Sequence, residues 1–320
     1  MRRVALAALS LALAVALLWW ALQEVPFARI AQTLASLSLA QIALLVLVNA
    51  AIMLLFPWRW WLILRSQGHS LPYLRLSAYR LAAFGVSYFT PGPHFGGEPL
   101  QVLLLSKRHA IKTPVAATSV ALDKLIELIA NFGFLVFAAG AVSLFSPDLL
   151  GQSTLRLGFS ALLILLPLLY LGLIWRGAKP LSRLASLRPG WAARLAELEA
   201  ALTDLLRTKP RLLLQTLAAS ALVWAALVFE YQLALVFLGQ PLPLLSVLTI
   251  MLFARLAMLA PTPGALGALE AGLVLALGLL GIDAAFALSL ALLIRARDLL
   301  FGGLGLALGA ALGLPRNSAA

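Results

Sequence analysis

The stretches TPGPHFGGE at residues 90–98 and TPGALGALE at residues 262–270 decide the fold of this chain. Each begins with Thr-Pro-Gly and reaches a glutamate eight residues after the threonine, and the two copies start 172 residues apart. Both lie in strongly apolar surroundings. A helix breaker followed by a carboxylate is costly in hydrocarbon, so its repetition predicts a duplicated membrane fold with a site between the copies.

The composition is that of a polytopic membrane protein. Hydrophobic residues make up 62% of the 320-residue chain and charged residues 11%, whereas soluble domains are nearer half apolar and a quarter charged. The net charge of +12 is typical of basic cytoplasmic loops that contact anionic lipid, so we expect no nucleic-acid partner. The chain has no cysteine, which excludes thiol catalysis and thiolate metal sites.

Six apolar stretches are each long enough to cross a bilayer, which takes about 20 residues. They are residues 4–22, 41–64, 114–145, 155–175, 212–238 and 284–314. The first could be a signal peptide, but its length and the lack of a clean cleavage site favour a retained span. Two further stretches, residues 73–105 and 244–280, are interrupted by the Thr-Pro-Gly elements and predict re-entrant helical hairpins.

Basic flanking residues favour opposite orientations for the two hairpins. Those around the first hairpin are Arg59, Arg65, Arg75, Lys107, Arg108 and Lys112, whereas neither residues 239–241 nor residues 281–283 contain lysine or arginine. The first hairpin should therefore enter from the cytoplasm and the second from outside. We predict an all-α membrane domain, residues 1–320, in which residues 1–150 and 151–320 form an inverted-topology repeat. Eight plain, kinked spans are the alternative.

Residues 176–211 form a basic segment within the second half. They contain eight lysines or arginines against three acidic residues. This pattern predicts a cytoplasmic amphipathic helix, or a pair of helices, on the inner leaflet. Counting spans from this segment puts both termini in the cytoplasm and the protein in the cytoplasmic (plasma) membrane.

The two broken elements are the candidate site. The predicted hairpin tips consist of Thr90, Pro91, Gly92, Gly96, Gly97, Thr262, Pro263, Gly264 and Gly267. Glycine allows close backbone approach, and the helix after each break directs its positive dipole end at the tip, which suits an anion. The alternative is that these glycines serve only the tight packing of two hairpins.

Charged residues inside the apolar stretches complete the candidate site. A charged cluster follows each glutamate by 25 residues, beginning at Asp123 in the first copy and at Arg295 in the second. The candidate substrate-binding or translocation residues are Glu98, Asp123, Lys124, Arg255, Glu270, Arg295 and Arg297. Charges in hydrocarbon are expensive, so we expect them to contact a substrate or to pair with neighbours such as Glu127 and Asp298. Structural salt bridges between helices are the alternative interpretation.

These residues resemble the transmembrane region of lysylphosphatidylglycerol synthases, a flippase-like membrane family. The matching pieces are PHFGGE at residues 93–98, Asp123-Lys124, PTPGALGALE at residues 261–270, and Arg295. Ala265 stands where the family often has a second glycine. The resemblance implies movement of a lipid headgroup across the bilayer. Nothing corresponds to the aminoacyl-transfer domain of the fused synthases, so we do not expect synthase activity.

The resulting hypothesis is a flippase-like transporter that needs no cofactor. A phosphate-bearing headgroup would enter a cavity between the hairpin tips, and the partner would be an anionic or headgroup-modified phospholipid or a polyprenyl-phosphate-linked lipid. One alternative is a membrane-embedded transferase acting on a lipid-linked donor. The other is a non-catalytic partner of a separate lipid-modifying enzyme. The sequence is compatible with a homo-oligomer and leaves open the transported lipid, the direction of transport and any coupling ion.

Overall fold

The computed structural model is α-helical and contains no strand in the residues that it describes. These are residues 15–22, 27–90, 96–145, 165, 167–185, 189–260 and 262–312. The predicted tip residues Pro91 and Gly92 lie outside the described residues. So do residues 4–14 of the predicted first span and residues 155–164 of the predicted fourth span.

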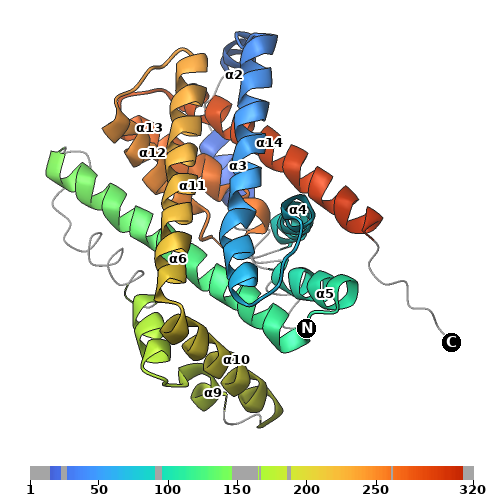
Figure 1. Cartoon of the computed structure of the whole chain (residues 1–320). Coiled ribbons are helices and arrows are strands. Elements are labelled where there is room, and N and C mark those ends of the chain that lie inside the picture. Colours follow the sequence, from blue (N-terminus) through green and yellow to red (C-terminus); the bar gives the residue numbers. More distant parts are fainter. Residues whose placement is uncertain are drawn as a thin grey trace.

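Four helices of 28 or more residues form the frame of the described molecule (Figure 1). They are α3 (Leu39–Ser66), α6 (Thr113–Phe145), α11 (Pro210–Phe237) and α14 (Ala284–Ala311), and each lies within a few residues of a predicted span. The first three are long and apolar enough to cross a membrane. Helix α14 has the same length as α3, but Arg295, Arg297 and Asp298 lie in its middle.

Local signals explain where three of these helices begin. Ser38 forms a capping box with Gln41 at the start of α3, in which each side chain accepts a hydrogen bond from the other residue's backbone N–H. Asp283 caps α14 by accepting from the Phe286 N–H at 2.9 Å. Helix α11 starts with Pro210, whose missing N–H would have no partner at that position in any case.

Two pairs of shorter helices lie between the long ones. Helix α4 (Tyr73–Phe89) contacts α5 (Glu98–His109), and α12 (Leu244–Ala257) contacts α13 (Ala268–Leu279). They contain 17, 12, 14 and 12 residues, which gives rises of roughly 26, 18, 21 and 18 Å against about 30 Å for the hydrocarbon core. Both breaks fall at the Thr-Pro-Gly elements, as predicted. Each limb by itself is thus shorter than the core is thick.

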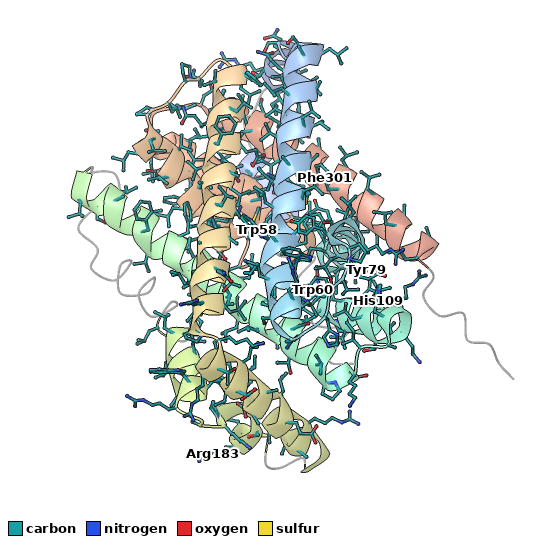
Figure 2. The ribbon with its side chains drawn as sticks, viewed as in Figure 1. Trp58, Trp60, Tyr79, His109, Arg183 and Phe301 are labelled. Atoms are coloured by element: carbon teal, nitrogen blue, oxygen red, sulfur yellow. The ribbon has the colours of Figure 1, made fainter. Side chains whose placement is uncertain are left out.

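A hydrogen bond links the two limbs of the first pair on the side away from the break. Tyr79 of α4 and His109 at the end of α5 lie together in Figure 2, and their Oη and Nε2 atoms are 2.9 Å apart. Helices α4 and α5 therefore stay in contact over much of their length, although they are two separate helices.

The second break is an irregular turn. It contains the short 3₁₀ element η1 (Pro263–Ala265), in which Gly264 has a φ of +53°, and Ala265 has a φ of +54°. The left-handed region costs a residue with a Cβ roughly 1–2 kcal/mol, which explains why glycine suits position 265. Position 265 is nevertheless alanine, so the backbone there bears this cost in free energy.

Helices α3 and α11 run in opposite directions and stand side by side in the middle of Figure 1. The end of α3 at Arg65 and Ser66 lines the same pocket as the beginning of α11 at Arg211 and Leu212.

The short helices pack reciprocally, since α5 contacts α6 and α13 contacts α14, while α4 contacts α14 and α12 contacts α6. Each pair of short helices therefore touches a long helix from both parts of the chain.

Helices α4 and α14 cross at glycines. A Cβ added to Gly85 would lie 2.6 Å from the carbonyl oxygen of Gly302, and one added to Gly305 would lie 2.1 Å from that of Leu81. Real Cβ atoms do not approach backbone so closely. The two backbones can therefore meet only because these positions lack side chains, as in other small-residue contacts between membrane helices.

Residues 176–211 contain two helices, in agreement with the helical part of the prediction. Helices α9 (Pro180–Leu184) and α10 (Pro189–Thr208) form the lower end of the molecule in Figure 1. One face of α10 is buried. Its residues Leu202, Leu205 and Leu206 pack in one cluster with Ile63 and Leu122. At the opposite end lies α2 (Phe27–Ala35), a short helix that the sequence analysis did not predict.

Candidate functional site

A cavity of about 380 Å³ lies between helices of the two predicted halves. Its wall is built from α3, α4, α5 and α6 in the first half and from α11, α12 and α14 in the second. Aromatic side chains such as Phe84 and Trp224 form part of this wall. Its cations are Arg59, Arg80, Lys124, Arg255 and Arg297, and its carboxylates are Glu98, Glu127 and Asp298. The wall is therefore amphipathic and carries more positive than negative side chains.

The first ion-pair network joins α3, α4 and α6. Arg59 Nε lies 2.6 Å from Asp123 Oδ1, and Arg80 Nη1 lies 2.8 Å from Asp123 Oδ2. Both arginines also bind Glu127. The Asp123 side chain is only 1% exposed, so the two guanidinium groups compensate a carboxylate that has lost its water.

Lys124 connects this first network to the first hairpin. Its Nζ atom lies 3.0 Å from Glu127 Oε1 and 3.3 Å from Glu98 Oε1. The other oxygen of Glu98 accepts a hydrogen bond from the backbone N–H of Gly96 at 2.8 Å. The side chains of Lys124 and Glu98 are 16% and 26% exposed, so this contact is partly open to the cavity.

The second ion-pair network begins with Arg295, which fastens the second tip to α14. Its guanidinium group donates to Glu270 Oε1 at 2.8 Å and to Glu270 Oε2 at 3.1 Å. It also donates to the backbone carbonyls of Gly264 and Ala265, the latter at 2.8 Å. The two carbonyls belong to the irregular turn, so Arg295 holds the strained backbone at Ala265 in place.

The other ion pairs of α14, which are counted with the second network although they share no residue with the Arg295–Glu270 pair, join α14 to α11. Arg297 Nη1 lies 2.8 and 2.9 Å from the two carboxylate oxygens of Glu230. Arg297 Nε also donates to Asp298 Oδ1 at 2.8 Å. Both carboxylates have side chains that are less than one tenth exposed, and the single positive charge of Arg297 is shared between them.

Arg255 differs from the other cations of the cavity wall. No carboxylate oxygen of the described residues lies within 4.0 Å of it, and its buried Nε atom has no hydrogen-bond partner there. Its Nη1 atom lies 3.8 Å from Met258 Sδ, and its guanidinium carbon lies 4.8 Å from the centroid of the Trp224 ring. Trp224 is itself stacked on Phe134 at a centroid distance of 4.0 Å. A buried cation with an unused donor favours an incoming anion.

The described part of the first tip packs closely on α4. Thr90 is the C-cap of α4, and Ser87 Oγ accepts a hydrogen bond from the Gly97 N–H at 2.9 Å. A Cβ on Gly97 would lie 2.1 Å from the Ala83 carbonyl oxygen. Gly96 has a φ of +135°. Glycine is therefore required at position 97 for space and suits position 96 for its backbone conformation.

The second tip packs against the end of the first limb of the first hairpin. A Cβ on Gly264 would lie 3.1 Å from the Tyr88 ring. Thr262 is fully buried, and its hydroxyl donates to the Leu266 carbonyl at 3.2 Å. Gly267 is the N-cap of α13 and has a φ of +76°. The two broken elements are therefore neighbours in the interior, although they are far apart in sequence.

Residues 7–305 match the protein family described as "Lysylphosphatidylglycerol synthase TM region". This chain belongs to that family. The matched range contains both pairs of short helices, the cavity wall and both ion-pair networks. No curated protein matches the chain. The family and the apolar helices identify an integral membrane protein of a lipid-related family, and the family resemblance found in the sequence is confirmed.

In this family member, the seven predicted side chains fall into two groups. Glu98, Lys124, Arg255 and Arg297 line the cavity. Asp123, Glu270 and Arg295 are not part of its lining and lie in the ion pairs described above. The first group therefore faces the cavity, whereas the second group forms contacts between helices.

One interpretation of the sequence was wrong, and two charged residues of these networks were missed. Arg59 was taken as a flanking cytoplasmic charge, but it is only 4% exposed and also donates to Ser220 Oγ at 3.1 Å. Glu230 was not singled out. Arg59 falls inside the predicted span 41–64 and Glu230 inside 212–238, and a lone charge within a span was the signal that could have identified both.

Proposed function

We propose that this protein is a flippase-like lipid transporter. In this proposal a phosphate-bearing headgroup crosses the bilayer through the cavity between the two hairpins. The observation that carries the proposal is the composition of the cavity wall, in which five cations face three carboxylates beside aromatic side chains. An amphipathic wall of this kind suits a ligand with an anionic head and an apolar remainder.

The proposed contact for the phosphate is Arg255. Four of the five cations in the wall already bind carboxylates, whereas Arg255 has none in the described part of the chain. A phosphate oxygen would bind the guanidinium group of Arg255, which lines the cavity, and the apolar part of the lipid would contact Trp224. Arg297 is neutralised by Glu230 and Asp298, so it would orient the headgroup more than attract it.

We also propose that α4–α5 and α12–α13 are re-entrant hairpins in an inverted repeat. The short rise of each limb supports this, as do the antiparallel α3 and α11 and the reciprocal packing of the short helices. Arg59 and Glu230 add support, because each is the twenty-first residue of its 28-residue helix. The basic end that carries α9 and α10 would then face the cytoplasm.

The chain has no native cysteine, which makes this topology directly measurable by labelling single introduced cysteines with an impermeant reagent. Substitutions at Gln67 and Ala110 are expected to react from the cytoplasmic side, and substitutions at Gln240 and Ile282 from the opposite side. All four residues reacting from one side would contradict the inverted repeat. A cysteine at Gly96 that reacts only from the outside would establish two full spans in place of the first hairpin.

Transport is tested in liposomes that contain the purified chain and fluorescently labelled phosphatidylglycerol or phosphatidylcholine. The proposal predicts faster exchange of the anionic label than in protein-free liposomes, and loss of this acceleration in Arg255→Gln. Arg183→Gln is the matched control, because Arg183 is exposed on α9 at the far end of the molecule (Figure 2). Equal rates for wild-type protein and Arg255→Gln would remove the proposal. A new lipid species in the mass spectrum would favour the transferase alternative.

A further inference from the structure

A second pocket lies outside the central cavity, at the end of the molecule where α10 joins α11. It has a volume of about 350 Å³ and is lined by the end of α3 and the beginning of α11. Its polar lining consists of Arg65, Ser66, Lys209, Arg211 and Gln215. Leu62 and Leu212 form its apolar part. None of these residues lines the central cavity.

The charge of this pocket is uniformly positive. Arg65, Lys209 and Arg211 line it, and no carboxylate does. None of the three cations forms an ion pair within the described part of the chain, in contrast to four of the five cations of the central cavity. The helix dipoles do not determine the sign of the charge in this pocket. The N-terminus of α11 contributes a partial positive charge, and the C-terminus of α3 contributes a partial negative charge. Three cations around one pocket without a carboxylate favour an anion between them.

The position of the pocket along the helices indicates the depth of its ligand. Helices α3 and α11 are both long and apolar enough to span the membrane, and the pocket lies where the apolar run of each helix ends. Leu62 and Leu212 lie on the apolar side of these ends, and Arg65 and Arg211 lie on the polar side. A basic pocket at headgroup depth between membrane helices suits the phosphate of an anionic lipid.

We propose that this pocket binds the phosphate of an anionic phospholipid of the cytoplasmic leaflet. The bound lipid is a resident one, distinct from the lipid that the central cavity would transport. Its phosphate contacts Arg65, Lys209 and Arg211, and its glycerol and first acyl carbons lie against Leu62 and Leu212. Because Lys209 precedes α11 directly and α10 ends at Thr208, the lipid also steadies the junction between the two helices.

The test uses the full-length chain in detergent, with unfolding followed by tryptophan fluorescence during titration with phosphatidylglycerol, phosphatidylcholine or inorganic phosphate. Phosphatidylglycerol is expected to raise the unfolding temperature, and the other two probes are expected to have little effect. The triple variant R65Q/K209Q/R211Q should lose this rise. Equal stabilisation of wild-type protein by inorganic phosphate would assign the site to a soluble anion and overturn the lipid proposal.

A control with equal loss of charge separates the pocket from general surface attraction. R75Q/R108Q/K112Q also removes two arginines and one lysine, all exposed and outside the pocket, and should keep the response to phosphatidylglycerol. Equal loss in both triple variants would overturn the proposal.

Should the pocket triple variant fail to fold, the single variant Arg211→Gln is used for the test. Each removed cation is expected to weaken binding about fivefold, from about 1 kcal/mol per basic residue, and unchanged affinity would overturn the proposal.

This inference does not depend on the transport activity of the central cavity. Arg255→Gln should strongly reduce the proposed transport and keep the stabilisation by phosphatidylglycerol, whereas R65Q/K209Q/R211Q should lose the stabilisation. Failure of the transport proposal therefore leaves the resident-lipid proposal testable by the melting measurement alone.

Discussion

The two ion-pair networks differ in size, because the first contains six charged side chains and the second contains five. The first consists of Arg59, Arg80, Lys124, Glu98, Asp123 and Glu127, and each of its cations contacts a carboxylate. The second consists of Arg295, Arg297, Glu230, Glu270 and Asp298, with Arg255 nearby. Arg255 is left out of the pairing in the described residues. The site for an added anion is therefore expected at the second network.

The two networks carry opposite charges at one matching position of α3 and α11. Arg59 of α3 and Glu230 of α11 hold the same position in helices of equal length, and their partners on α6 and α14 are Asp123 and Arg297. Both positions therefore form an ion pair, but the cation lies on α3 in the first network and on α14 in the second. Arg297 binds both Glu230 and Asp298, and no carboxylate of the described residues pairs with Arg255.

The hairpin contacts also differ in burial. Glu270 and Arg295 have side chains that are 7% and 10% exposed, and Arg295 binds two backbone carbonyls as well. Glu98 and Lys124 are 26% and 16% exposed and lie 3.3 Å apart. The second tip is therefore fixed on α14 more firmly than the first tip is fixed on α6. Of the two hairpins, the first is the one expected to move.

The largest effect is expected from breaking the buried contact. Glu270→Gln leaves the buried Arg295 charge without a carboxylate, and removal of one partner of a buried pair costs about 3–5 kcal/mol. Glu98→Gln removes the more exposed counterpart and should cost about 1 kcal/mol or less. Reversible unfolding in detergent measures both variants, and equal losses would contradict the comparison.

The second prediction concerns the helix crossing that holds the networks in place. Gly85→Ala puts a Cβ against the backbone of α14 and should lower the free energy of unfolding by about 1–3 kcal/mol. Gly303→Ala is the control, because a Cβ there meets nothing within 4 Å. The control should be neutral or slightly stabilising. A neutral Gly85→Ala variant would show that α4 and α14 do not approach each other as described.

The third prediction separates Arg255 from Arg80. Arg255→Gln should reduce transport of labelled phosphatidylglycerol about tenfold, equivalent to about 1.4 kcal/mol, and leave stability unchanged or slightly higher. Arg80→Gln should lower stability, because Asp123 and Glu127 each lose a partner. Thermal unfolding and liposome transport are measured side by side. Destabilisation by Arg255→Gln equal to that by Arg80→Gln would place Arg255 in an ion pair.

The fourth prediction supplies Arg255 with the carboxylate that it lacks. Met258 Sδ lies 3.8 Å from Arg255 Nη1, so Met258→Glu places a negative group within reach. This variant should reduce transport about fivefold, from a charge contact of about 1 kcal/mol. Met258→Gln has the same shape without the charge and should retain activity. Equal transport rates for the two variants would argue against an anion at this position.

Much of the helical frame could be predicted from sequence. Apolar runs identified α3, α6 and α11 within a few residues, and the Thr-Pro-Gly elements located both breaks. The charged cluster 25 residues after each glutamate placed Arg295 among the candidate site residues together with Glu270, and these two side chains bind each other. Local pattern was sufficient in these cases because helix length and helix breaking are local properties.

Pairing between distant helices could not be predicted in the same way. Arg297 and Glu230 are 67 residues apart, and only the packing of α11 near α14 makes them partners. Arg59 was misread because a cation near the end of a span is often one that reaches the interface. That no carboxylate of the described residues pairs with Arg255 depends on distances, which composition and spacing do not contain.

The central claim is that a lipid phosphate binds at Arg255 in the cavity between the two networks. A density map of the protein in nanodiscs of phosphatidylglycerol tests this most directly. The account predicts phosphate density within hydrogen-bond distance of the Arg255 guanidinium group, with a glycerol backbone beside Trp224. A well-ordered map in which Arg255 is paired with a carboxylate and the cavity holds no lipid would contradict it.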